Sequence, residues 1–160
     1  MRKLLAVLLL LPLVFPLVYA AEVSVQAQVQ KYITVTFSYS AVNFGTLNAG
    51  TTDNPAPNQL NGVYNVSVDT NYAYDVKASG TDFSDGAGHT FAVSNLKMDT
   101  NSTASNLAVG SAIALSGTQQ TIDSYAYTVT NNFHGFWLSI PAGQYAASYS
   151  STVTISYSNQ

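Results

Sequence analysis

Few side chains in this 160-residue chain could do chemistry. It has two histidines, His89 and His134, no cysteine, and a single glutamate, Glu22. Neither histidine stands in an HExxH sequence or another metal motif, and no GxSxG sequence presents a serine nucleophile. His134 shares a strand phase with Phe136 and Leu138, which favours a hydrogen-bonded, partly buried histidine over a metal ligand. We therefore expect no catalysis, no metal site and no cofactor.

Two polar patterns leave a bound ion or a modification open. Asp82 and Asp85 lie in the glycine-rich stretch 80–88, which could hold calcium, but their spacing fits no EF-hand loop and favours a polar turn. Asn65 and Asn101 each begin an N-glycosylation sequon. We expect Asn101, in a loop, to be glycosylated more fully than Asn65, which falls within an expected strand.

The aromatic residues raise the possibility of sugar binding. Of the 11 tyrosines, all but Tyr19 follow the first twenty residues, and Trp137 joins them. Aromatic rings stack on sugars, but most of these tyrosines alternate within strands, which is typical of core or cross-strand positions. Tyr145 and Tyr149, close to the turn at Pro141, fit either a core or an exposed sugar-binding position.

The first twenty residues predict export. Arg2 and Lys3 precede an apolar run, 4–18, and the small residues that follow predict signal-peptidase cleavage after Ala20. The run is shorter than the roughly 20 residues of a membrane-spanning helix. Its two prolines disfavour the long assembly helix of a type IV pilin. We expect residues 1–20 to be a signal peptide and the mature protein to be secreted, extracellular or at the cell surface, without membrane contact.

The expected mature chain is acidic and poor in charge. It keeps three lysines against eight acidic residues, a net charge of about −5. No basic patch remains to neutralise phosphates, so we expect no nucleic-acid partner. A surface of hydroxyls and amides with little charge repulsion favours self-association. Without disulfides, neighbouring subunits are one source of stability.

Alternating apolar and polar residues predict an all-β fold. Segments 64–68 and 72–78 flank an Asp-Thr-Asn turn at 69–71 and predict a hairpin. Further strands are expected around four groups of apolar residues: Phe91 and Val93; Tyr125, Tyr127 and Val129; Phe136, Leu138 and Ile140; Val153, Ile155 and Tyr157. About eight short antiparallel strands separated by turns predict a β-sandwich, with Greek-key and jelly-roll orders both open.

The first stretch of the mature chain alternates most regularly. Its odd-numbered positions are apolar until Lys31 interrupts them, and the alternation resumes in the same phase over 33–39. One strand over 21–39 would span about 60 Å at roughly 3.3 Å per residue, beyond ordinary strand lengths. Two strands in line do not easily fold back within one sheet, so we expect the first, 22–29, to leave the domain. Its apolar row consists of Val23, Val25, Ala27 and Val29.

Three stretches resemble parts of bacterial and archaeal surface β-domains: 42–51, 72–80 and 138–155. Together with the features above, the chain resembles the subunits of archaeal bundling pili and threads, and more distantly the camelysin-like biofilm-matrix fibre proteins. The resemblance implies an antiparallel, jelly-roll-like β-sandwich over 32–160 and an N-terminal donor strand over 21–31. The donor strand would complete the sheet of a neighbouring subunit through the row that contains Val23, Val25, Ala27 and Val29.

The expected function is that of a structural subunit. Identical subunits would assemble head to tail into an extracellular filament, a pilus, thread or biofilm fibre, by donor-strand complementation. Such a filament could contact neighbouring filaments or surface glycans. The alternatives are a monomeric cell-surface adhesin or carbohydrate-binding β-sandwich module, and another structural envelope protein such as a surface-layer component.

Overall fold

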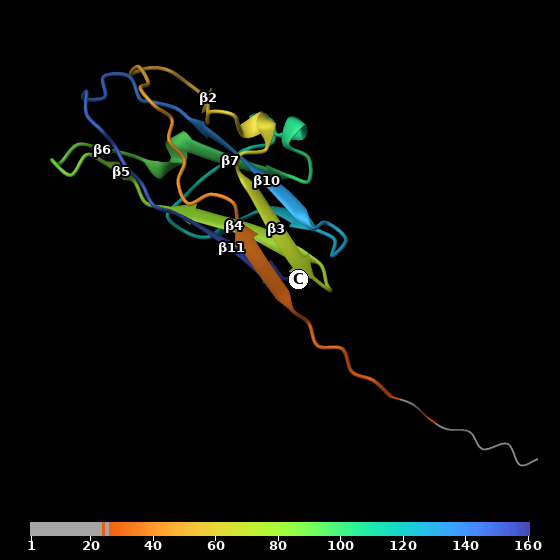
Figure 1. Ribbon diagram of the computed structural model, residues 1–160. Coiled ribbons are helices and arrows are strands. Elements are labelled where there is room, and N and C mark those ends of the chain that lie inside the picture. Colours follow the sequence, from red (N-terminus) through yellow and green to blue (C-terminus); the bar gives the residue numbers. More distant parts are fainter. Residues whose placement is uncertain (1–23, 25) are drawn as a thin grey trace, which may run out of the picture.

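The computed structural model describes residue 24 and residues 26–160 (Figure 1). They form three single-turn 3-10 helices, η1 (Gln59–Asn61), η2 (Val93–Asn95) and η3 (Ala104–Asn106), and no α-helix. None of the helices in this part of the chain is long and apolar enough to span a bilayer. Its strands are β1 (Ile33–Phe37), β2 (Asn54–Pro55), β3 (Asn65–Thr70), β4 (Tyr74–Gly80), β5 (Phe83–Ser84), β6 (Thr90–Phe91), β7 (Leu96–Asn101), β8 (Ile113–Ala114), β9 (Gln120–Tyr125), β10 (Asn131–Leu138) and β11 (Val153–Asn159).

The strands form two antiparallel sheets that pack against each other, and one short hairpin. The larger sheet has the order β1-β3-β10-β7-β8, and β2 adds to the end of β10. The smaller sheet has the order β11-β4-β9, and the hairpin consists of β5 and β6. This arrangement confirms the all-β prediction and is consistent with a β-sandwich.

Apolar side chains from both sheets fill the space between them. In β4 every second residue is buried, from Tyr74 through Val76 to Ala78. Met98 of β7 and Phe136 of β10 face them from the larger sheet. Each large apolar side chain buried in this way contributes roughly 1.5–3 kcal/mol. The period-two pattern of the sequence therefore reflects the inward faces of the strands.

The hairpin predicted over 64–78 is wrong. Strand β3 pairs with β1 and β10, whereas β4 pairs with β11 and β9, so the turn at 69–71 connects the two sheets. Val68 before the turn and Tyr74 after it belong to one buried cluster. The alternation of residues predicts which side chains of each strand face the core. It does not predict whether two successive strands pair with each other or lie in opposite sheets.

Two further strands are shorter than predicted. Strand β6 stops at Phe91, and Val93 begins a 3-10 turn whose first N–H donates to Oδ1 of Asp82 at 2.8 Å. Strand β9 ends at Tyr125, opposite the first residue of β4, so no neighbouring strand remains to pair with residues 126–129. The last predicted strand is present as β11.

On one side of the molecule, the segment that connects the larger sheet to the smaller one forms backbone hydrogen bonds with both sheets. After β8, the N–H of Leu115 donates to the carbonyl of Leu96 in the larger sheet, at 2.9 Å. The carbonyl of the next residue, Ser116, accepts the N–H of Gly80 in the smaller sheet, also at 2.9 Å. Strand β9 then pairs with β4. We call this the closed side.

Candidate functional site

On the opposite side the sheets end in two strands that each pair along one edge only. Strand β1 pairs with β3, and β11 pairs with β4. The chain leaves β1 as residues 39–47, and no backbone hydrogen bond joins these residues to a strand within the described part of the chain. Unpaired strand edges present rows of N–H and C=O groups that can pair with another chain. We call this the open side.

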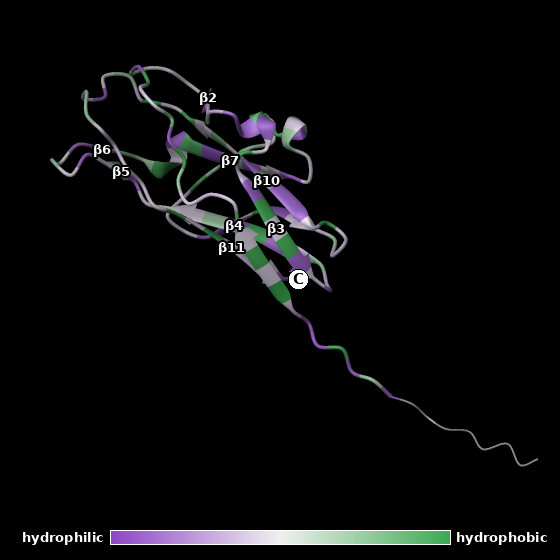
Figure 2. Cartoon of the chain, viewed as in Figure 1, coloured by the Kyte–Doolittle hydropathy of each residue, from purple (hydrophilic) through white to green (hydrophobic). Residues whose placement is uncertain are grey.

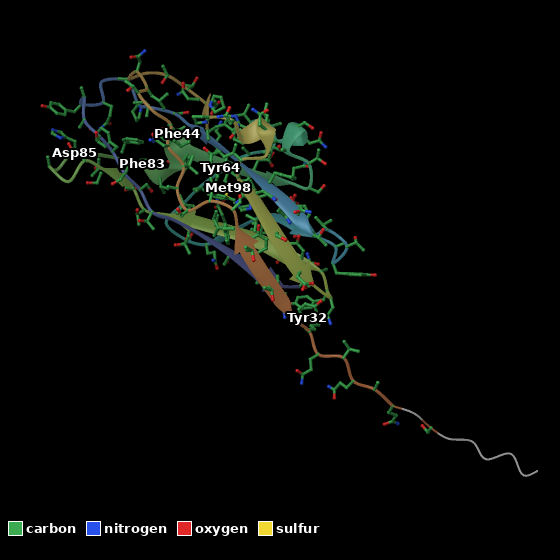
Figure 3. All side chains as sticks on the ribbon, viewed as in Figure 1. Tyr32, Phe44, Tyr64, Phe83, Asp85 and Met98 are labelled. Atoms are coloured by element: carbon green, nitrogen blue, oxygen red, sulfur yellow. The ribbon has the colours of Figure 1, made fainter. Side chains whose placement is uncertain are left out.

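A groove with a volume of about 830 Å³ lies along the open side. Segments 39–49 and 144–151 line it, and Leu138 of β10 and Val153 of β11 are among the apolar side chains from the two sheets. Figure 3 shows Phe44 and Phe83, two lining residues, near one end of the molecule. The groove therefore combines apolar side chains from both sheets with polar residues of the two segments, and it lies beside the unpaired edge of β11.

Apolar contacts hold segment 39–49 over the groove. Val42, Phe44 and Leu47 are half-buried and pack against the main core cluster. A local turn shapes the segment: Oδ1 of Asn43 accepts the N–H of Gly45 at 2.8 Å, and Gly45 has a φ of 69°, which glycine adopts readily. Because strand pairing does not fix this segment, it can shift at lower cost than a strand.

A histidine with two tyrosine partners joins the larger sheet to the open side. His134 of β10 is fully buried; its Nδ1 lies 2.5 Å from Oη of Tyr39 and its Nε2 lies 2.9 Å from Oη of Tyr157 in β11. A neutral imidazole offers one donor and one acceptor, and tyrosine hydroxyls can serve either. Burial lowers the pKa of His134 to about 3, so the ring is neutral. The sequence prediction of a hydrogen-bonded structural histidine fits this arrangement.

The N-terminal segment leaves the body of the protein at the base of β1. Residues 26–32 are exposed and lie outside the strands, and Figure 1 shows them extending away from the sheets. Apolar and polar residues alternate along this segment in Figure 2, and Val29 is 81% exposed. An exposed apolar row of this kind is available to a partner.

The turn between β3 and β4 holds the base of this segment. Nδ2 of Asn71 donates to the carbonyl of Gln30 at 2.8 Å, and its Oδ1 accepts the N–H of Tyr32 at 3.1 Å. The hydroxyl of Tyr32 donates to Oδ1 of Asp69 at 3.0 Å. The ammonium of Lys31 lies 5.3 Å from the centre of the ring of Tyr72, a cation–π distance. We call these residues of the turn and the segment base the clamp.

Comparison with models of protein families, with curated proteins and with solved structures finds no match. The interpretation of the open side therefore depends on its geometry and on the sequence pattern.

The predicted donor residues fall partly outside the described residues. The predicted signal peptide, 1–20, and the donor positions Val23 and Val25 are among the residues that the structure does not describe. Ala27 and Val29 are described and exposed.

The two predicted glycosylation sites lie on either side of one residue. Asn65 of β3 and Asn101 of β7 both pair with Phe133 of β10. Both asparagines are half-buried, and Oδ1 of Asn101 accepts the N–H of Thr103 at 3.0 Å. The prediction that Asn101 lies in a loop is wrong, because its backbone is the last pair of the β7–β10 ladder.

The candidate calcium carboxylates lie at opposite ends of the β5–β6 hairpin. In the turn, Oδ1 of Asp85 accepts the backbone N–H groups of Ala87 and His89, at 2.8 and 3.1 Å. Asp82, just before β5, accepts the N–H of Val93, just after β6, so each side chain has a role in shaping the hairpin. The described residues contain no group of three or more metal-ligating side chains.

Sequence reasoning missed the groove and the clamp. The groove forms between segments that lack periodicity, so no pattern in the sequence indicates it. For Tyr39 a signal exists, because it continues the odd-numbered phase of Ile33, Val35 and Phe37 beyond the end of β1.

Proposed function

We propose that this protein is a secreted structural subunit of an extracellular filament. Residues 22–29 of one copy add as a strand to the open side of the next copy, and the sheets take a jelly-roll-like order completed by this strand. The observation that carries the proposal is the groove on the open side, which is lined by segment 39–49, the continuation of β1, and by residues of β11, whose outer edge is unpaired. The chain has no catalytic role in this proposal.

The donor segment has the pattern that strand addition requires. An added strand forms main-chain hydrogen bonds with an edge and places alternate side chains in the groove. Its row would bury Val23, Val25 and Val29, each contributing roughly 1.5–3 kcal/mol, with a smaller contribution from Ala27. Gln26, Gln28 and Gln30 would lie on the opposite face. This gain and the main-chain hydrogen bonds, at about 0.5–1.5 kcal/mol each, together roughly balance a backbone entropy cost of roughly 1–2 kcal/mol for each ordered residue.

The open side offers a donor strand both apolar contacts and backbone hydrogen-bonding partners. Within a single copy, residues 26–29 are exposed and lie outside the strands. The groove supplies apolar contacts through residues such as Leu138 and Val153, and the edges of β1 and β11 supply donors and acceptors. Segment 39–49, which covers the groove without strand pairing, can move to admit the strand. Filling the groove also removes two exposed edges from solvent.

The placement of donor and acceptor favours a chain of subunits over a closed dimer. In Figure 1 the N-terminal segment leaves one end of the molecule, and the segment connecting β10 to β11 lies at the other end. In Figure 3, Tyr32 at the base of the segment lies far from Phe44 at the groove. A contact between two different surfaces is heterologous and repeats without closing unless the rotation forms a ring.

Electron microscopy of the purified mature protein tests the proposal. Deletion of residues 21–30 and the change Val25→Asp should each abolish filaments, because they remove or charge the apolar row. Gln26→Asp places the same charge on the polar face and should leave filaments intact. Normal filaments from the deletion variant, or monodisperse particles from the wild-type protein, would contradict the proposal, and the second result would favour a monomeric surface-binding module.

A mixing experiment tests the acceptor separately. A subunit without residues 21–30 can still accept a strand but cannot donate one, so it should end a growing filament. Adding it to wild-type protein should shorten filaments in proportion to its share of the mixture. The same deletion combined with Val153→Asp in the groove is the control and should no longer shorten them. Unchanged filament length with the first variant would show that the open side is not the acceptor.

A further inference from the structure

An exposed stack of two rings stands at the tip of the β5–β6 hairpin. The rings of His89 and Tyr145 lie parallel, with an interplanar angle of 8° and centroids 4.2 Å apart. Tyr145 is 61% exposed although it is in contact with another ring. The two residues come from segments 56 positions apart in the sequence, so the stack is a tertiary contact.

A buried carboxylate fixes the histidine of this stack. Nδ1 of His89 lies 2.6 Å from Oδ2 of Asp85, whose side chain is only 4% exposed. The other oxygen of Asp85 accepts two backbone N–H groups of the same turn. The hydrogen bond from His89 lowers the pKa of Asp85. Both oxygens of the carboxylate are thus engaged in holding the ring and the turn.

A second set of contacts fixes the tyrosine. The hydroxyl of Tyr149 donates to the carbonyl of Tyr145 at 3.0 Å and accepts Nε2 of Gln144 at 2.7 Å. The ring of Tyr149 packs edge-on against Phe91 of the core at 5.1 Å. The residues after Tyr145 are Ala146, Ala147 and Ser148, which are small and exposed. The backbone and one ring face of Tyr145 are therefore held in place, and small neighbours leave the ring accessible.

Other exposed tyrosines in the described residues lack this support. Tyr127 is 57% exposed in the loop after β9, and the hydroxyl of Tyr32 bonds within the clamp. Tyr145 differs because its ring is presented to solvent and is also held by contacts from the hairpin and the core. An aromatic face held rigid before binding loses little conformational entropy when a ligand stacks on it.

We propose that the stack of Tyr145 and His89 is a binding site for neutral pyranose sugars. The apolar face of a pyranose ring matches an exposed aromatic face. Ser148 is exposed and Gln144, next to Tyr145 in the sequence, is half-buried; their hydroxyl and amide oxygen can form hydrogen bonds with sugar hydroxyls. The carboxylate of Asp85 beside the stack and the lack of a lysine or arginine in this cluster favour a neutral sugar over an anionic one. The site goes beyond filament assembly, although Tyr145, Gln144 and Ser148 also line the groove that would accept the donor strand.

Fluorescence polarisation with labelled oligosaccharides tests the site. Labelled gluco-, manno- and galacto-oligosaccharides are titrated with the full mature protein, and an oligoalginate serves as the anionic comparison. The wild-type protein should bind at least one neutral probe, and Tyr145→Ala should weaken that binding by about tenfold or more. Tyr145→Phe, which keeps the ring, and Tyr127→Ala, which removes an exposed tyrosine elsewhere, should bind within about twofold of the wild type.

Three outcomes would overturn the proposal: no binding of any neutral probe, binding of the oligoalginate alone, or equal affinity in Tyr145→Ala. Because Tyr145 also lines the groove, the titration is repeated with the variant that lacks residues 21–30, whose groove stays empty; sugar binding by that variant is then read separately from filament formation. Glycans released from the purified protein and from the envelope of the producing cell, labelled in the same way, distinguish the two sources of the sugar. Binding of either fraction that depends on Tyr145 supports the site.

Discussion

The two sides on which the sheets meet differ in how completely one copy of the chain closes them. On the closed side, backbone hydrogen bonds continue from β8 through Leu115 and Ser116 into the smaller sheet. Side chains add to them: Nε2 of Gln120 donates to the carbonyl of Ala114, and the hydroxyls of Thr100 and Tyr125 lie 2.9 Å apart. On the open side, β1 and β11 keep unpaired edges beside a groove.

The difference separates stability from assembly. Contacts on the closed side are complete within one copy and serve its folding. Those on the open side are incomplete within one copy, and the N-terminal segment that we propose as their partner leaves the molecule at the other end. Substitutions on the closed side should therefore act mainly on unfolding, and those on the open side mainly on filament formation.

Truncating a closed-side core residue should have the largest effect on stability. Leu115 is almost fully buried, so Leu115→Ala should lower the free energy of unfolding by about 2–5 kcal/mol. Phe44→Ala is the open-side counterpart. Phe44 is half-buried in the groove, so its loss should cost less than about 2 kcal/mol in unfolding while impairing assembly. Urea titrations and electron microscopy measure the two quantities, and equal destabilisation by both changes would remove the distinction.

The histidine of the open side should make stability depend on pH. The pKa of His134 is about 3 in the folded protein, against about 6.5 in an unfolded chain. Between these values the unfolded chain binds a proton that the folded chain does not. Stability should therefore fall as the pH drops below about 6.5, by up to about 1.4 kcal/mol per pH unit, and should be unaffected by this group at higher pH.

Unfolding in urea between pH of about 6.5 and about 4.5 measures this dependence. Hydrogen bonds from Gln160 and His89 lower the pKa values of Asp75 and Asp85, respectively. Because an unfolded aspartate titrates near 3.9, their contributions are lost only below this range. His134→Gln should flatten the slope, whereas His89→Gln should leave most of it. An equally steep slope in His134→Gln would show that another group causes the pH dependence.

The alternation of apolar and polar residues predicted where the strands lie better than it predicted which strands pair with each other. The alternation in β4, β10 and β11 marks residues that face the core, because burial of one face imposes a period of two. It also predicted a structural role for His134, which lies in phase with Phe136. Whether β3 and β4 pair or lie in opposite sheets depends on distant strands, so the local turn at 69–71 could not decide it.

The ring stack and the clamp depend on contacts between residues far apart in the sequence, which no short sequence pattern predicts. Tyr145 and Tyr149 have similar sequence surroundings, yet one stacks on His89 at the surface and the other packs against Phe91. Their difference comes from the position of the β5–β6 hairpin, more than fifty residues earlier. Similarly, Asn71 reads as an ordinary turn residue, although its side chain binds the base of the N-terminal segment.

The smallest expected effect concerns this clamp, which joins the donor segment to the body. Asn71→Ala removes two exposed hydrogen bonds, one to the carbonyl of Gln30 and one from the N–H of Tyr32. Each contributes about 0.5–1 kcal/mol, so the local opening of the segment base should become roughly fivefold to thirtyfold more frequent. Hydrogen exchange at the amide of Tyr32 measures this opening directly, and the free energy of global unfolding should change little because β1 to β11 keep their contacts.

A second variant separates the two bonds. Asn71→Asp keeps an oxygen that can accept the N–H of Tyr32 but loses the donor to Gln30, so exchange at Tyr32 should rise by only about twofold to fivefold. Because the clamp sets the direction in which the segment leaves the body, Asn71→Ala should also yield filaments that bend more easily in electron micrographs, with their number unchanged. Unchanged exchange at Tyr32 in Asn71→Ala would mean that β1 alone holds the base, and the direction of the donor segment would then be set by the sheet edge.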